Sequence, residues 1–234
     1  MFSESLGAGS QAALVAQLVR GGVLGRTSYA AAAMQKTDRS IFCALGGPYE
    51  DVPQPIGHGQ TISAPHMHAK ALSLLEPVIS KAARTNGYVS VLDVGTGSGY
   101  VLAALGRLCF LAGASSCKLI GLETVRDLAD KAEKNIHTAC PDLAKWMRIV
   151  VSDGWEGWAE DGPYDVIHVG ASAEVFPEKL ATQLANGGRM LVPVGSEFEQ
   201  TYLKCDKDFN GEVSCESVAS VLFVPLVHTP RREL

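Results

Sequence analysis

Three acidic residues each stand at the end of an apolar, strand-like segment. Asp93 ends YVSVLD, Glu123 ends KLIGLE and Asp153 follows MRIVV. Because the carboxyl ends of neighbouring parallel strands meet at one edge of a sheet, we expect these carboxylates to lie close together. Any one of them alone would more simply be a solvated strand end or a helix cap. Together they indicate a ligand site.

A glycine-rich loop follows Asp93 directly. Gly95, Gly97 and Gly99 lie between a strand and a helix, where missing side chains let a ligand approach the amides of the helix N-terminus. The spacing is GxGxG, whereas the dinucleotide fingerprint is GxGxxG. The glycines alone therefore leave a nicotinamide or flavin nucleotide, or a tight turn without a ligand, as alternatives.

The charge of Asp93 distinguishes between the candidate ligands. A carboxylate there would repel a pyrophosphate on the loop, but it would stabilise a ligand with an ammonium and a sulfonium group. S-adenosylmethionine carries both cations, so Asp93 favours it as the cofactor. Glu123 would accept hydrogen bonds from the ribose hydroxyls, and Asp153 would accept one from the exocyclic adenine amine.

The elements that position these residues alternate between strand and helix from Ser63 onward. Such alternation predicts an α/β fold with a mostly parallel, doubly wound, Rossmann-like sheet that is covered by helices on both faces. Two strand-like runs around the turn DFNG add an antiparallel C-terminal hairpin. The predicted strands are 88–95, 118–123, 147–153, 164–170 and 190–195, and the predicted helices are 63–84, 100–112, 124–139 and 177–188.

The first part of the chain has a different pattern. Apolar spacing predicts a helix over Gln11–Arg20, and Thr27 can cap a second helix that ends near Gln35. Residues 44–60 are rich in Gly and Pro, so we expect a loop there. We therefore divide the chain into a helical N-terminal extension with a substrate-side loop (1–62) and a cofactor-binding domain (63–234), which together form one structural unit.

The start of that domain carries further signals. Ser63 can cap the first helix, which has a proline in its first turn, and Pro77 should kink the same helix.

Composition limits the class of protein. The chain has 234 residues, 47% of them apolar and 19% charged, which suits one large α/β domain. The formal charge of −5 disfavours a nucleic acid or an anionic membrane as partner. No segment has the roughly 18 uninterrupted apolar residues that a membrane span needs. Without a heptad repeat or an obvious apolar stripe, we predict a monomer.

The cysteines and the N-terminus suggest a compartment. The cysteines at positions 43, 109, 117, 140, 205 and 215 form no CxxC pair and no zinc-type spacing with histidine. We therefore predict reduced thiols. The first ten residues, MFSESLGAGS, lack the basic start and apolar block of a secretion signal. Both observations favour the cytoplasm.

Six segments together resemble the protein-L-isoaspartate O-methyltransferase family, in the same order and over nearly the whole chain. TISAPHMHA is the most specific, because other methyltransferases share the glycine loop but lack this segment. The matching segments are TDRSIF (37–42), PIGHGQTISAPHMHA (55–69), VLDVGTGSG (91–99), PYDVIHVGASA (163–173), GGRMLVPVG (187–195) and VPL (224–226).

The resemblance implies methyl transfer from S-adenosylmethionine to the free α-carboxyl of L-isoaspartyl residues in damaged proteins, and more weakly to the β-carboxyl of D-aspartyl residues. S-adenosylhomocysteine would be the second product. The methyl ester would then collapse to a succinimide, whose hydrolysis returns some normal aspartyl linkage. Isoaspartyl proteins and peptides would therefore be the partners of a repair enzyme.

The resemblance also implies roles for individual residues. It places the active-site serine at Ser63, and it makes Val224 a candidate for main-chain contact with the isoaspartyl peptide. Glu123 replaces a common aspartate, and the tail VHTPRREL matches no motif of the family. With the glycine loop, the expected cofactor contacts are Thr61, Ile62, Ser63, His68, Asp93, Gly95, Gly97, Ser98, Glu123, Thr124, Ser152 and Asp153.

The chemistry of the reaction assigns a role to Ser63. An isoaspartyl α-carboxyl is ionised at neutral pH, so no general base is needed. Ser63 would then donate a hydrogen bond that positions the carboxylate, since no G-x-S-x-G segment marks it as a nucleophile. His66 and His68 lack a third ligand of suitable spacing, so we expect no metal.

Other functions compete with this interpretation. The segment after the fourth strand reads HVGASAEVFP and lacks the Asn/Asp-Pro-Pro-aromatic motif of base-amino methyltransferases, which disfavours a nucleobase substrate. A different methyltransferase that uses S-adenosylmethionine, and a non-catalytic module that only binds this cofactor, remain as alternatives. A hydride-transferring enzyme is disfavoured by Asp93.

Overall fold

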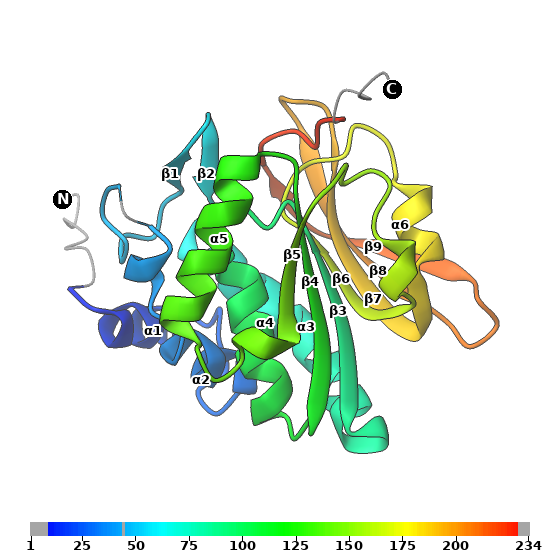
Figure 1. Cartoon of the computed structure of the whole chain (residues 1–234), viewed down its shortest axis with the longest axis horizontal. Coiled ribbons are helices and arrows are strands. Elements are labelled where there is room, and N and C mark those ends of the chain that lie inside the picture. Colours follow the sequence, from blue (N-terminus) through cyan, green and yellow to red (C-terminus); the bar gives the residue numbers. More distant parts are fainter. Residues whose placement is uncertain (1–8, 44, 229–234) are drawn as a thin grey trace.

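The computed structural model describes residues 9–43 and 45–228, and in this part a seven-stranded sheet lies at the centre (Figure 1). The strand order is β5-β4-β3-β6-β7-β8-β9. The strands from β5 to β7 in this order are parallel, whereas β8 pairs antiparallel with β7 and β9. The predicted sheet and its C-terminal hairpin are thus confirmed. The strands are Tyr88–Val94 (β3), Ser116–Glu123 (β4), Met147–Val151 (β5), Tyr164–Val169 (β6), Leu184–Gly195 (β7), Gln200–Lys207 (β8) and Val213–Val221 (β9).

The sheet is covered on both faces, and β3 shows why its strands are apolar throughout. Val89 and Val91 pack into one core, and Leu92 and Val94 pack into a second core on the opposite face. Helices α3, α4 and α5 contribute to the first core, and α6 contributes to the second (Figure 1). The helices are Pro65–Asn86 (α3), Tyr100–Leu111 (α4), Arg126–Ala139 (α5) and Glu178–Thr182 (α6).

Helix α6 is shorter than predicted. The expected helix covered 177–188, but β7 begins at Leu184, where it pairs with Tyr164 of β6. Pairing with β6 replaces helical hydrogen bonds in this stretch, and the sequence Asn186-Gly187-Gly188 disfavours a helix. Helix α3 continues through Pro77 as a single helix. Among the described residues, no helix combines the length and apolar character that a bilayer crossing requires.

The N-terminal helices pack on the same core as α4. Leu14 of α1 (Gln11–Arg20) and Met34 of α2 (Tyr29–Gln35) are buried with α4 residues, and the short helix η1 (Arg39–Ile41) follows them. The prediction of α1 is confirmed. Ser28, and not Thr27, caps α2, because the Ser28 hydroxyl accepts the Ala31 N–H. The division of the chain at residue 62 stays a prediction.

The segment predicted as a loop contains a small β-hairpin. Strands β1 (Gln54–Gly57) and β2 (Gln60–Ile62) pair antiparallel around a turn in which His58 has a φ of 54°. The loop prediction is therefore wrong over this hairpin. The predicted cap of α3 is also wrong, because Ala64 is the N-cap residue and no side chain caps the helix. The hydroxyl of Ser63 is thus not committed to a helix cap.

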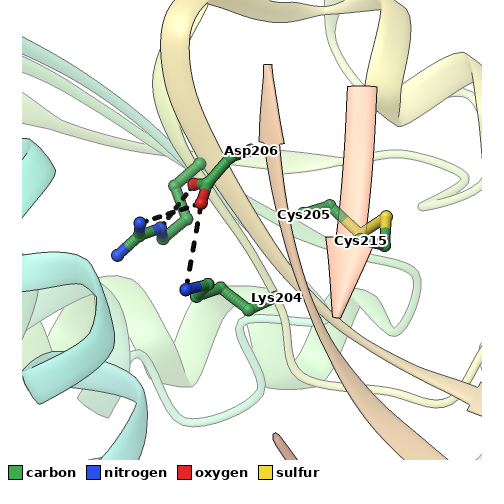
Figure 2. The surroundings of a disulfide bond; sticks show 5 residues. Lys204, Cys205, Asp206 and Cys215 are labelled. Atoms are coloured by element: carbon green, nitrogen blue, oxygen red, sulfur yellow. Dashed lines mark hydrogen bonds and ion pairs between the residues drawn. A yellow bond between two sulfur atoms is a disulfide. The ribbon is translucent and has the colours of Figure 1, made fainter. Parts of the chain in front are cut away.

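Two cysteines form a disulfide, which corrects the prediction of reduced thiols. The β8–β9 register places Cys205 opposite Cys215, and their sulfur atoms are bonded (Figure 2). Sequence spacing could not show this pair, because it depends on the register of the hairpin. The cysteines at 43, 109, 117 and 140 are buried free thiols.

Reduction of this disulfide should destabilise the protein. The bond closes a loop of ten residues, and opening such a loop restores chain entropy to the unfolded state, at a cost of about 2–3 kcal/mol in the free energy of unfolding. Urea unfolding with and without dithiothreitol measures the difference. The variant Cys205→Ser/Cys215→Ser is the control, because the reductant has no bond to break in it. Equal stability of the oxidised and reduced wild-type protein would contradict the prediction.

Candidate functional site

The glycine loop joins β3 to α4 at the carboxyl edge of the sheet. Gly97 and Gly99 have φ angles of 54° and 85°, which residues with side chains rarely adopt. A Cβ at Gly97 would lie 3.2 Å from Ile56 Cδ1, and one at Gly99 would lie 3.3 Å from the Ala132 carbonyl oxygen. The glycines therefore let the loop pass closely between the β1–β2 hairpin and α5.

Asp93 is buried beneath this loop, with 1% of its surface exposed. Its Oδ1 lies 2.7 Å from Nδ1 of His168, and its Oδ2 accepts a hydrogen bond from the Thr96 hydroxyl at 2.7 Å. Because an ionised carboxylate can only accept, His168 donates from Nδ1. His168 is the residue of β6 opposite Asp93. The Asp93 carboxylate thus joins β3, β6 and the start of the loop.

Glu123, at the end of β4, is 7% exposed and holds the other side of the loop. One of its oxygens accepts the Gly97 N–H at 3.0 Å, and the other accepts the Val125 N–H at 3.0 Å. A carboxylate oxygen has a second lone pair, so both oxygens can still accept from a ligand.

Asp153, after β5, is bonded to its own loop and to the C-terminal segment. Its Oδ1 accepts the Trp155 N–H at 2.9 Å, and its Oδ2 lies 3.1 Å from Nδ1 of His228. The rings of His228 and Trp155 are stacked, and the indole N–H of Trp155 donates to the Leu226 carbonyl. Asp153 and Trp155 therefore hold the segment 226–228 at the carboxyl edge of the sheet.

Three adjoining compartments meet at this edge, and we name each by a residue that lines it. The Glu123 compartment encloses about 530 Å³, part of it open to solvent, and the C-terminal segment forms one wall. The Asp93 compartment lies along the glycine loop and is smaller, at about 350 Å³, also partly open to solvent. The Phe223 compartment lies between the start of α3 and the segment 220–224. Thr61 and Gly170 line all three.

The structure brings nearly all predicted site residues to these compartments. Ser63 lines both the Asp93 and the Phe223 compartments, and Val224 lines both the Glu123 and the Phe223 compartments. Asp153 does not line any of the three. The Glu123 compartment contains Thr61, Gly95, Gly97, Glu123, Thr124 and Ser152, and the Asp93 compartment contains Thr61, Ile62, Ser63, His68, Asp93, Gly95, Gly97 and Ser98.

The two histidines near the start of α3 have separate partners. Nδ1 of His66 lies 2.9 Å from a carboxylate oxygen of Asp51, whereas Nδ1 of His68 lies 3.2 Å from Nη1 of Arg39. His68 is buried, and burial together with the Arg39 charge holds its pKa well below the usual value. Within the described ranges, no three His, Cys, Asp or Glu side chains are placed to hold a metal ion.

Sequence reasoning missed several residues of the site. Gly170 follows β6 as Gly95 follows β3, so the rule that ligands bind at strand ends could have identified it. Pro225, Leu226 and Val227 also line the Glu123 compartment; the first two belong to the matched segment VPL but were not predicted as contacts, because the position of this segment depends on bonds with Trp155 and Ser172. Tyr100, at the start of α4, lines the Asp93 compartment.

The sheet order, the glycine loop after β3 and Glu123 at the end of β4 define the class of protein. A mostly parallel sheet with the antiparallel extension β8–β9 is the Rossmann-like fold of methyltransferases, which places the cofactor at the carboxyl ends of the strands. The predicted fold class is confirmed.

Comparison with known proteins identifies the family. The family model for protein-L-isoaspartate(D-aspartate) O-methyltransferase matches residues 9–231. Protein-L-isoaspartate O-methyltransferase 1 of Arabidopsis thaliana is 42% identical over 200 residues, which cover 84% of this chain and 82% of the relative. The enzyme of Caenorhabditis elegans is 38% identical and covers 86% and 84%. A Plasmodium falciparum structure, assigned to the same activity and in complex with S-adenosyl-L-homocysteine, superposes with a TM-score of 0.82 at 32% identity, covering 93% of this chain and 98% of that one.

The chain therefore belongs to the protein-L-isoaspartate(D-aspartate) O-methyltransferase family.

Proposed function

We propose that this protein transfers the methyl group of S-adenosylmethionine to the α-carboxyl of L-isoaspartyl residues, and more weakly to the β-carboxyl of D-aspartyl residues, in damaged proteins. Family membership supports the reaction and the cofactor. One structural observation carries the proposal: the Asp93 and Phe223 compartments adjoin, because Thr61, Ser63 and Gly170 line both of them. A methyl donor on one side of this junction can reach a carboxylate on the other side.

We assign the cofactor to the two compartments on either side of the glycine loop. Gly95 and Gly97 line both the Glu123 and the Asp93 compartments, so one elongated ligand can occupy both. Glu123 would accept hydrogen bonds from the ribose hydroxyls. Ser152 lines the same compartment and would contact the adenine base. The contact of Asp153 with the adenine amine stays a prediction, and it would have to coexist with the bonds to Trp155 and His228.

We assign the isoaspartyl peptide to the Phe223 compartment. Ser63 lies at its inner end, next to the Asp93 compartment, and Val224 lies on its wall. The Val224 carbonyl already accepts the Ser172 N–H at 2.8 Å. We propose that the Val224 N–H makes the main-chain contact with the peptide, as in the addition of a strand to a sheet edge.

The protein's part in the reaction is alignment. When bound, S-adenosylmethionine supplies a methyl group already activated by its sulfonium. The substrate carboxylate is ionised at neutral pH and needs no base. The Ser63 hydroxyl would donate a hydrogen bond that orients this carboxylate for in-line displacement, and Thr61 and Gly170 would exclude water from the junction. Opposite charges cancel during the transfer, so a pocket of low polarity favours it.

We also propose that the protein acts as a monomer in the cytoplasm, without a nucleic-acid or membrane partner. The net charge of −5 disfavours a nucleic acid or an anionic membrane as partner. The four buried free thiols support a reducing compartment, whereas the Cys205–Cys215 disulfide is the observation against it. Sedimentation equilibrium and cell fractionation test the two parts, and a dimer mass or secretion would overturn them.

The decisive assay compares two peptides that differ only in the linkage of one residue. With labelled S-adenosylmethionine, the isoaspartyl peptide should acquire a base-labile methyl ester, whereas the normal aspartyl isomer should acquire none. Methylation of neither peptide, with cofactor binding intact, would favour a non-catalytic module or another substrate class and would contradict the proposal.

The variant Ser63→Ala should lower kcat by roughly 100-fold, because the substrate carboxylate loses its orienting hydrogen bond. The dissociation constant for S-adenosylhomocysteine should stay nearly unchanged. The matched control is Ser73→Ala, which removes a hydroxyl of α3 that donates to the Val23 carbonyl and should leave kcat at the wild-type value. Unchanged turnover of Ser63→Ala with a saturating isoaspartyl peptide would exclude this role.

A further inference from the structure

Arg39 is a fully buried cation next to the Asp93 compartment. Its Nη1 lies 3.2 Å from His68 Nδ1, and its guanidinium carbon lies 5.7 Å from the ring centre of Tyr100. Both His68 and Tyr100 line the compartment. In the part of the chain that the structure describes, Nε and Nη2 of Arg39 have no hydrogen-bond partner. A buried guanidinium without its full set of partners is costly, so its position requires an explanation.

The neighbours of Arg39 do not neutralise its charge. Burial raises the pKa of Tyr100 to about 12, so the phenol is uncharged at neutral pH. Asp38 is bonded to the Ser40 N–H, and Asp51 is bonded to His66. Among the described residues, no carboxylate oxygen lies within 4.0 Å of the Arg39 guanidinium. The positive charge is therefore available to a ligand in the compartment.

Arg39 also determines which nitrogen of His68 carries the proton. A guanidinium only donates, so Nδ1 of His68 must accept. Burial and the Arg39 charge keep His68 neutral by lowering its pKa. Its single proton is therefore on Nε2, and His68 offers the compartment a hydrogen-bond donor.

The Asp93 compartment thus has charges of opposite sign around it. The negative charge is the Asp93 carboxylate, which is bonded to Thr96 and His168. The positive charge is Arg39, which is bonded to the lining residue His68. A zwitterion with one ammonium and one carboxylate matches this arrangement. The amino-acid end of S-adenosylmethionine has this chemistry, and the glycine loop connects the compartment to that of the nucleoside.

We propose that Arg39 is a positioning residue that fixes His68 as the Nε2–H tautomer, so that His68 donates to the carboxylate of the cofactor's amino-acid end, and that the buried charge of Arg39 selects an anion there. The inference rests on the proposed function, because it assumes the same cofactor. A purely structural role is the competing explanation, since the guanidinium of Arg39 is fully buried against His68 and the ring of Tyr100.

The test compares two ligands that differ only in the carboxylate, S-adenosylhomocysteine and its decarboxylated analogue. Calorimetric titration measures both dissociation constants for the full chain. In Arg39→Met, the affinity for S-adenosylhomocysteine should fall by about 10- to 100-fold, as expected for the loss of a charge-assisted contact. The affinity for the analogue should change by less than about 2-fold, and Arg39→Lys should restore part of the preference.

Two controls separate this role from stability. Arg107→Met removes another largely buried arginine, which lies two turns further along α4 than Tyr100 and pairs with Asp142, and it should not change the ratio of the two affinities. In the wild-type protein, ¹⁵N NMR of His68 should show an unprotonated Nδ1, a readout that does not depend on whether Arg39→Met folds.

The outcomes distinguish this inference from the proposed function. A protonated Nδ1 in the wild type, or an affinity ratio that Arg39→Met leaves unchanged, would overturn the inference alone. A wild-type protein that binds neither ligand would overturn the proposed function as well.

Discussion

The buried carboxylate of Asp93 is the constraint on which the rest of the site depends. Its two oxygens are tied to His168 on β6 and to Thr96 in the glycine loop, so one side chain fixes the spacing of two strands and the start of the loop. A carboxylate at this depth requires such partners, because an unpaired buried charge is strongly destabilising. The same group sets the electrostatic character of the compartment above it, which favours a cationic methyl carrier over a diphosphate.

Segments far apart in the sequence complete the site around that carboxylate. The β1–β2 hairpin supplies Thr61, the glycine loop supplies the floor, and the C-terminal segment closes one wall through Leu226. Within this site the Asp93 and Phe223 compartments share a boundary, and Ser63 lines both of them. Methyl transfer between two bound molecules requires such a boundary, because each reactant needs its own pocket and the reacting atoms must meet where water is excluded.

The sequence was sufficient to predict the sheet and the residues at its strand ends, such as Asp93 and Glu123, because both follow from local patterns. The remaining expected contacts, Ser63 and His68 among them, came from the resemblance to a family. Strands buried on both faces are continuously apolar, and ligand-binding residues cluster at their carboxyl ends. The errors concern features that depend on distant partners. The β1–β2 turn contains a non-glycine residue, His58, with positive φ, the disulfide depends on the β8–β9 register, and the tail is held by Trp155. The environment of Arg39 is likewise a product of tertiary packing between η1, α3 and α4.

Selection of the cofactor by charge is the central claim, and competition between two cofactor classes tests it most directly. Both S-adenosylmethionine and NADH offer ribose hydroxyls to Glu123, but only NADH would place a diphosphate above Asp93. Calorimetric titration of the wild-type protein should show stoichiometric binding of S-adenosylmethionine, and no heat from NADH at the same concentrations. Binding of NADH with equal or higher affinity would contradict the account.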